Sequence, residues 1–227
     1  MGTTGIGTDG LGLPEPPAAC SLCERLTEFR GENVRAEPNW FNAPVPSFGS
    51  ETARLLIVGL APGLRGANRT GRPFTGDFAG DLLYATLLEF GFAHGAYAAS
   101  PDDGLALDET MITNAVRCVP PENRPTGGEI TACRPFLTAR LLSLPRLQAV
   151  LVLGKIAHDS ALQALGVRKS SCPFKHGARH EIRDGLVLFD SYHCSRYNTN
   201  TGKLTTAMFR SVFGLVRAHL DAVPPQR

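Results

Sequence analysis

The chain reads LLIVGLAPG over residues 55–63, a short apolar run that leads into a loop of glycine and proline. A run of this length, bounded by turn residues, is typical of a buried strand in a parallel sheet. Three further runs share these features: Met111–Val116, Ala149–Gly154 and Leu186–Tyr192. Together with Leu55–Gly59 they predict a four-stranded, mostly parallel sheet.

Helical patterns alternate with these runs. They cover Phe78–Phe90, a segment that begins at Thr126 and runs to about Leu142, Ile156–Leu165 and Thr205–Leu220. Thr126 and Glu129 have the spacing of a capping box, which marks a helix start. Alternating strands and helices predict a three-layer α/β/α domain. Ligands of such domains bind beyond the carboxyl ends of the strands.

Composition and charge place few limits on function. Of 227 residues, 43% are hydrophobic and 19% are charged, which is typical of a globular domain. The net charge of +2 permits binding to nucleic acid without arguing for it. We expect a disordered tail over residues 1–18, a single domain over 19–222 and a short tail over 223–227. With no membrane-spanning run and no secretory signal, the sequence predicts a cytoplasmic protein, expected to be monomeric.

Four of the six cysteines form two pairs. Cys20 and Cys23 have C-x-x-C spacing, and Cys118 and Cys133 flank a second segment. Four thiolates can hold a zinc ion or a [4Fe–4S] cluster, and the spacing does not choose between them. The alternative is two unrelated pairs of buried cysteines. The remaining two cysteines, Cys172 and Cys194, are expected to be structural.

The loop after the first strand carries residues suited to a nucleic acid. Its sequence continues LRGANRTGRPFTGDFAGD, which offers one aromatic side chain, Phe74, and an acid, Asp77. Aromatic and basic residues on one loop suit a base lifted out of DNA. The residues expected to contact phosphate are Arg65, Asn68, Arg69 and Arg72. The alternative is a plain turn between a strand and a helix.

Three motifs occur in order along the chain: GLAPG with GANRTGRPFTGD, then TNAVRC, then HCSRYN at residues 193–198. Together they resemble the iron–sulfur uracil-DNA glycosylases of families 4 and 5, and the NRTGRPFTGD loop is most similar to family 5. The resemblance runs from Cys20 to the last helix. Three positions depart from the family patterns: Leu60 replaces an acid of family 4, Gly63 an alanine of family 5, and Cys194 a proline.

The resemblance implies an enzyme that flips uracil out of DNA and hydrolyses its N-glycosidic bond, leaving an abasic site. It implies a [4Fe–4S] cluster on Cys20, Cys23, Cys118 and Cys133, and uracil-containing DNA as the partner. The residues expected to bind substrate are Gly59, Ala61, Pro62, Gly63, Phe74, Asn114, Ser195, Arg196, Tyr197 and Asn198.

Breaking an N-glycosidic bond leaves negative charge on the base and positive charge on the sugar. His193 is expected to stabilise the leaving base, and Asp77 to orient water or stabilise the sugar cation. The amide of Asn114 can accept from uracil N3–H and donate to O4, which cytosine cannot match. Each residue also has a purely structural alternative. His193 could be a surface histidine, Asp77 a helix cap and Asn114 a strand-end asparagine that satisfies the backbone.

The residues of two loops are predicted to contact DNA in less specific ways. Phe74 is expected to stack on the base, or else to be a core aromatic. Ser195, Arg196 and Tyr197 resemble a loop that enters DNA, and Asn198 is expected to contact backbone or phosphate. Two rival functions remain open: a non-catalytic iron–sulfur protein that binds damaged or abasic DNA, and a phosphate-binding α/β enzyme acting on nucleotides.

Overall fold

The computed structural model describes residues 13–223, which are organised around a six-stranded sheet. Its strand order is β1-β5-β2-β6-β8-β7. The four central strands are mutually parallel: Thr110–Asn114 (β5), Leu55–Gly59 (β2), Ala149–Leu153 (β6) and Leu186–Ser191 (β8). They confirm the four predicted runs. Every residue in them is buried, as expected for parallel strands covered on both faces.

The predicted sheet size was wrong, because two antiparallel strands extend the sheet at its edges. These are Phe48–Gly49 (β1), which pairs with β5, and Arg179–Arg183 (β7), which pairs with β8. β1 is too short to produce a pattern, and β7 alternates exposed and half-buried residues. Charged, partly exposed edge strands of this kind lack the apolar run that identifies a central strand. A separate two-stranded sheet joins Ala93–His94 (β3) to Ala106–Leu107 (β4).

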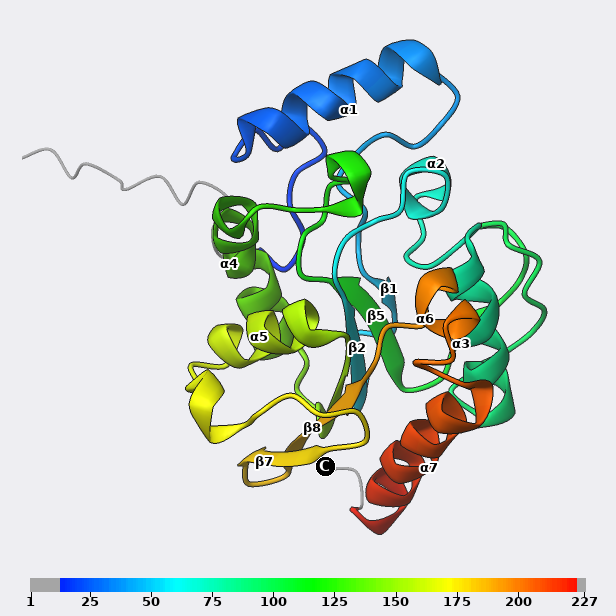
Figure 1. Cartoon of the computed structure of the whole chain (residues 1–227), viewed down its shortest axis with the longest axis vertical. Coiled ribbons are helices and arrows are strands. Elements are labelled where there is room, and N and C mark those ends of the chain that lie inside the picture. Colours follow the sequence, from blue (N-terminus) through cyan, green and yellow to red (C-terminus); the bar gives the residue numbers. More distant parts are fainter. Residues whose placement is uncertain (1–12, 224–227) are drawn as a thin grey trace, which may run out of the picture.

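Helices cover both faces of the central sheet, which confirms the three layers (Figure 1). Phe78–Glu89 (α3) and Thr206–Ala222 (α7) pack on one face, and Gly127–Ser143 (α4) and Lys155–Ala164 (α5) pack on the other. All four predicted helices are therefore present, with ends within two residues of the expected ones. The capping box at the start of α4 is formed in both directions.

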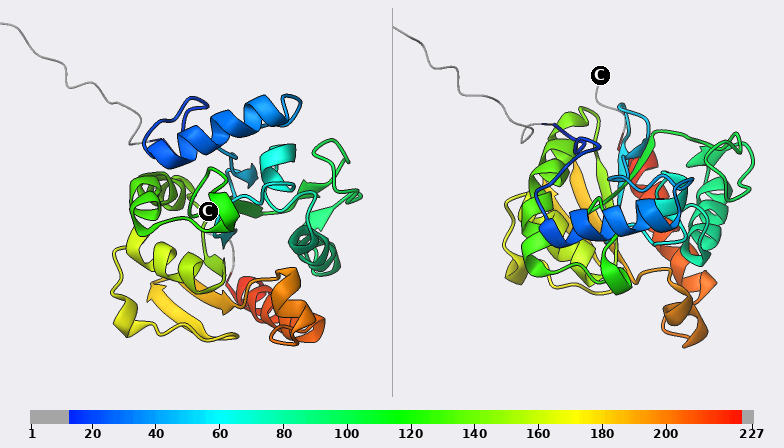
Figure 2. Two further views of the ribbon diagram at one scale, coloured as in Figure 1. Left: turned by 45° about the horizontal axis from the view of Figure 1, so that its top comes forward. Right: turned by 90° about the horizontal axis from the view of Figure 1, so that it is seen from above.

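Three helices were not predicted: Glu24–Ala36 (α1), Ala67–Thr70 (α2) and Arg196–Asn200 (α6). α2 and α6 are too short for a periodic pattern, and α1 buries only Leu26, Arg30 and Asn33. α1 lies over one end of the sheet, as the view from that end shows (Figure 2). Its position there brings it to the loops that follow the parallel strands. Two short 3₁₀ turns complete the described elements, Pro121–Asn123 and Lys169–Ser171.

The predicted tails lie largely outside the described residues, since residues 1–12 and 224–227 are not described. From Leu13 onward the chain has a defined course. The Glu15 carboxylate accepts hydrogen bonds from Arg117 at 2.9 Å and from Arg140 at 2.6 Å. Both arginines are nearly fully buried, so this segment is fastened to the body of the protein. Within residues 13–223, no helix is long and apolar enough to cross a membrane.

Candidate active site

A cavity of about 610 Å³ is lined by residues from the ends of β2, β5 and β8 and the loops that follow them. This position, beyond the carboxyl ends of parallel strands, is the expected one for a ligand. The cavity brings together most of the residues that the sequence predicted. They are Ala61, Pro62, Gly63, Phe74, Asp77, Asn114, His193, Ser195 and Arg196.

Gly59, at the end of β2, lies beneath this cavity and does not line it. A Cβ atom at Gly59 would overlap the Asn114 amide oxygen and the Phe74 ring. The missing side chain therefore allows both groups to lie close together over the end of the strand.

Asn114 ends β5 and is almost fully buried. Its Oδ1 atom has no hydrogen-bond partner among the described residues. Leaving a buried acceptor unpaired costs about 1–3 kcal/mol, so such an atom in a cavity wall indicates a ligand that supplies the missing donor. The alternative role for Asn114, a strand-end residue that satisfies the backbone, leaves this oxygen unexplained.

Phe74 forms one wall of the cavity. Its ring centroid lies 6.0 Å from that of His193, and the two rings are inclined by 30°. Its backbone φ is 53°, a left-handed conformation that is strained for a bulky residue. Strain of this kind persists only where the surroundings fix it, and it often marks a functional site.

Asp77 caps α3, since its Oδ1 accepts from the Gly80 amide at 3.1 Å. Asp77 also lines the cavity, so its role as a helix cap is compatible with a catalytic role. Burial raises the pKa of the Asp77 carboxyl, and the amides of Gly80 and Ala79 act in the opposite direction. A Cβ at Gly66 would overlap the carboxylate, and one at Gly63 would lie 3.0 Å from Oδ2. Glycine at both positions leaves room beside this carboxylate.

His193 follows β8 and faces the cavity. Burial lowers its pKa to about 4, so the imidazole is neutral at pH 7. Within residues 13–223, no hydrogen bond to its ring is found, while its carbonyl accepts from the Asn198 side chain at 2.8 Å. A neutral imidazole with a free ring N–H can donate to an anion developing on a leaving base.

The residues that follow His193 make different contacts. Ser195 caps α6 by accepting from the Asn198 amide at 3.3 Å. The Arg196 guanidinium lies 5.4 Å from the centre of the Phe78 ring. Tyr197 is 75% exposed and does not line the main cavity. Asn198 lines an adjoining cavity of about 440 Å³. Neither Tyr197 nor Asn198 therefore lines the main cavity.

Two predicted phosphate contacts were wrong. Asn68 is fully buried and donates to Asn42 at 2.9 Å. Arg72 is also buried, and its guanidinium pairs with the Asp103 carboxylate at 2.8 Å. Sequence alone could not show which side chains of this loop turn inward. Arg65 and Arg69 are exposed and remain available to a phosphate.

Asn123 also lines the cavity, although no sequence pattern predicted it as a site residue. It belongs to the segment between Cys118 and Cys133. Glu122 and Asn123 both have left-handed backbones, with φ of 55° and 56°. The sequence PPENRP contained the available signal, because proline and asparagine together favour a tight turn.

The four predicted metal ligands converge beside α1, where all of them line one small buried cavity. Arg30 donates to the Cys118 sulfur at 3.2 Å, and the Arg117 amide donates to the Cys133 sulfur at 3.4 Å. Among the described residues, no three of the cysteine sulfurs lie within 4.8 Å of one another. Tetrahedral zinc, with bonds of about 2.3 Å, needs sulfurs about 3.8 Å apart.

Comparison with known proteins identifies the family to which the chain belongs. Residues 46–217 match the family model described as the uracil DNA glycosylase superfamily. The match includes the central strands and the loops that form the cavity. The chain therefore belongs to the uracil DNA glycosylase superfamily.

Within the superfamily, the chain is similar to proteins named Type-5 uracil-DNA glycosylase. The protein from Thermus thermophilus is 46% identical over 200 residues, covering 86% of this chain and 90% of that protein. The one from Mycobacterium leprae is 42% identical over 205 residues, covering 86% and 89%. A Type-4 uracil-DNA glycosylase from Sulfurisphaera tokodaii is 30% identical over 222 residues, covering 95% and 86%. These relatives confirm the resemblance to families 4 and 5.

Proposed function

We propose that this chain is an enzyme that removes uracil from DNA by hydrolysing the N-glycosidic bond, leaving an abasic site. The observation that carries the proposal is the unpaired, buried Oδ1 of Asn114 in the cavity wall. Uracil offers a donor at N3, whereas the N3 of cytosine is an acceptor and would leave two acceptors face to face. Phe74, next to Asn114, provides the aromatic surface on which the flipped base stacks.

The chemical step is divided between two side chains. Neutral His193 donates a hydrogen bond to the base as negative charge develops on it. The Asp77 carboxylate stabilises the positive charge on the sugar or orients the attacking water. Both line the same cavity, as a shared transition state requires.

Tyr197 is the residue proposed to fill the gap that the flipped base leaves in the DNA. Ser195 is engaged in capping α6, and Arg196 lies against Phe78. Tyr197 is 75% exposed, and a large exposed aromatic side chain beside the cavity suits insertion between bases. Asn198 is proposed to support this loop through its bond to the His193 carbonyl.

The four converging cysteines are proposed to hold a [4Fe–4S] cluster. The convergence of the four cysteines on one small cavity and the donors from Arg30 and Arg117 suit a cluster with hydrogen-bonded sulfurs. When bound, the cluster supplies a structural cross-link, because glycosidic hydrolysis transfers no electrons. It would join α1, the segment that carries Asn123, and α4. All six cysteines are unpaired, in keeping with the reducing cytoplasm in which we propose the protein acts as a monomer.

A non-catalytic protein that binds damaged DNA is the second candidate. Such a protein would not need both a half-buried acid and a neutral histidine in the wall of its base pocket. An assay for strand scission at abasic sites distinguishes the two candidates. Its substrates are single- and double-stranded oligonucleotides that contain uracil, thymine, hypoxanthine or xanthine. We expect scission at uracil after alkaline treatment. Tight binding to uracil DNA without scission would support the binding protein instead, and hydrolysis of free nucleotides alone would support a nucleotide enzyme.

A further inference from the structure

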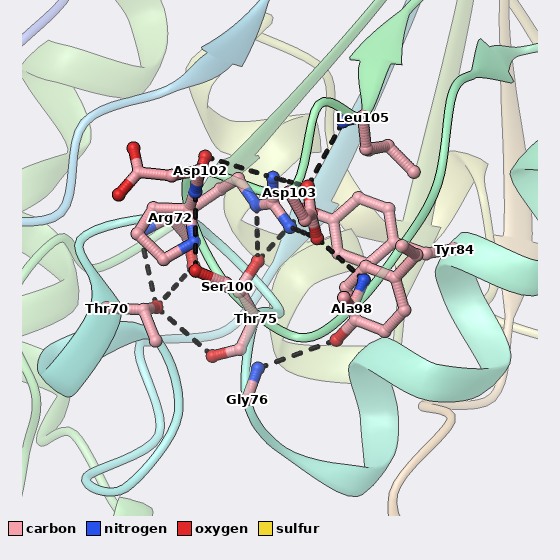
Figure 3. A network of polar contacts seen from close by, with 12 residues as sticks. Thr70, Arg72, Thr75, Gly76, Tyr84, Ala98, Ser100, Asp102, Asp103 and Leu105 are labelled. Atoms are coloured by element: carbon pink, nitrogen blue, oxygen red, sulfur yellow. Dashed lines mark hydrogen bonds and ion pairs between the residues drawn. The ribbon is translucent and has the colours of Figure 1, made fainter.

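Arg72 is a buried arginine that the proposed chemistry does not use. It lies in the loop between β2 and α3, and its side chain is 4% exposed. Its Nη1 and Nη2 atoms each donate to one carboxylate oxygen of Asp103, both at 2.8 Å (Figure 3). Asp103 belongs to the segment between β3 and β4, and its side chain is 1% exposed. A bidentate, desolvated pair of this kind combines strength with a fixed relative orientation.

The surroundings of Arg72 hold the guanidinium in the interior. The rings of Phe48, Tyr84 and Tyr97 surround it, with centroids 5.2, 5.3 and 5.8 Å from its central carbon. Distances below about 6 Å are those of favourable cation–π contacts. Arg72 therefore points away from solvent, and no DNA phosphate can reach its guanidinium.

The contacts around Arg72 fix the residues on either side of Phe74. Arg72 Nε donates to the Thr75 hydroxyl at 2.7 Å (Figure 3). The Tyr84 hydroxyl donates to the Pro73 carbonyl at 2.6 Å. Phe74 lies between these two points with its left-handed φ of 53°. Because such a backbone is unfavourable for phenylalanine, it requires surroundings that exclude the relaxed alternative.

Asp103 provides the other half of this arrangement. Its two oxygens also accept from the backbone amides of Ala98 at 2.9 Å and Leu105 at 3.1 Å. The segment between β3 and β4 is thus organised around one carboxylate. That carboxylate is directed at the loop that forms the base pocket.

We propose that Arg72 and Asp103 are a positioning pair that holds Phe74 in its strained conformation, so that the ring is preformed as the stacking surface for a flipped base. The pair touches neither the base nor the DNA. The inference rests on the proposed uracil excision, because it assigns the pair a role in the same pocket.

A double-mutant cycle tests the proposal. Asp103→Asn is made in the wild-type chain and in Phe74→Ala, and uracil excision is measured in single turnover with saturating enzyme, beside the dissociation constant for uracil DNA. In the wild-type background we expect Asp103→Asn to slow excision about 10-fold, within the loss of up to about 10² that a 1 Å displacement causes. The dissociation constant should change by less than about 2-fold. In Phe74→Ala, the same substitution should slow excision by less than about 2-fold, because coupled residues are not additive.

Arg54→Lys is the matched control. Arg54 is also buried, but it lies at the opposite end of β2, where it donates to Gln148 and to the Leu220 carbonyl. We expect Arg54→Lys to lower Tm without slowing excision, and Arg72→Lys to slow excision because lysine cannot form the fork. Asp103→Asn decides the matter if Arg72→Lys does not fold.

Three results would overturn the positioning role. The first is a wild-type excision rate in Asp103→Asn. The second is an equal slowing by Asp103→Asn in both backgrounds, and the third is a loss of DNA affinity that accounts for the slower rate. If the wild-type chain itself does not excise uracil, the proposed function fails rather than the positioning pair.

Discussion

Replacing Asp77 by asparagine separates the two roles that the structure gives this residue. As the cap of α3, Asp77 accepts from the Gly80 amide, and asparagine caps a helix about as well as aspartate. Tm should therefore stay close to that of the wild type. The substitution removes the negative charge but keeps the size of the side chain, so any loss of excision reports on the charge.

The size of that loss follows from the burial of the carboxylate. Because Asp77 is half-buried, an effective dielectric constant of about 20 is appropriate, and a sugar cation about 4 Å away would be stabilised by about 4 kcal/mol. This corresponds to a factor of about 10³ in rate. We expect Asp77→Asn to slow single-turnover excision by about 10²–10⁴, the range for loss of an acid–base group. DNA affinity should be largely unchanged, because a carboxylate near phosphates does not favour ground-state binding.

The control is Asp81→Asn, which removes a charge from the same helix at an exposed position outside the cavity. Its excision rate should equal that of the wild type. Single-turnover rates and dissociation constants on one uracil oligonucleotide are measured for both variants. If Asp77→Asn excises uracil at the wild-type rate, the proposed role of the charge is refuted and Asp77 is a helix cap only.

The other expectations use the same assay or a direct analysis of the protein. His193→Ala should slow excision by about 10²–10³, the loss of one preorganised donor, and a smaller loss than 10-fold would remove His193 from the transition state. The excision rate should fall at acid pH as Asp77 is protonated. Because burial raises the pKa of Asp77, this fall should occur at a higher pH than for an ordinary aspartate, and the pH profile of Asp77→Asn should lack it. The excision rate should not change near pH 6.5 through titration of His193, because burial lowers its pKa to about 4. A histidine titration near pH 6.5 would contradict this burial. Asn114→Asp should shift base choice toward cytosine, and unchanged uracil excision would exclude Asn114 from the pocket. Anaerobically purified protein should be brown and contain four irons per chain, whereas stoichiometric zinc without iron would exclude the cluster.

The central architecture could be predicted because its signals are local. Each central strand is buried at every residue, so it appears in the sequence as a continuous apolar run. The edge strand Arg179–Arg183 has one face in solvent and carries charges, so no such run identifies it. For the same reason α1, which buries few apolar side chains, has no periodic signal.

The sequence by itself determined the parallel sheet, the residue types near the carboxyl ends of its strands and, through the family motifs, the class of protein. Only the tertiary structure decided which of those side chains face the cavity. Asn68 and Arg72 occupy the same loop as Arg65 and Arg69, yet the first two are buried and the last two are exposed. The direction of each depends on partners distant in sequence, Asn42 and Asp103, and on the space left by glycines around Asp77 and Phe74. These contacts are not local, so a pattern along the chain does not reveal them.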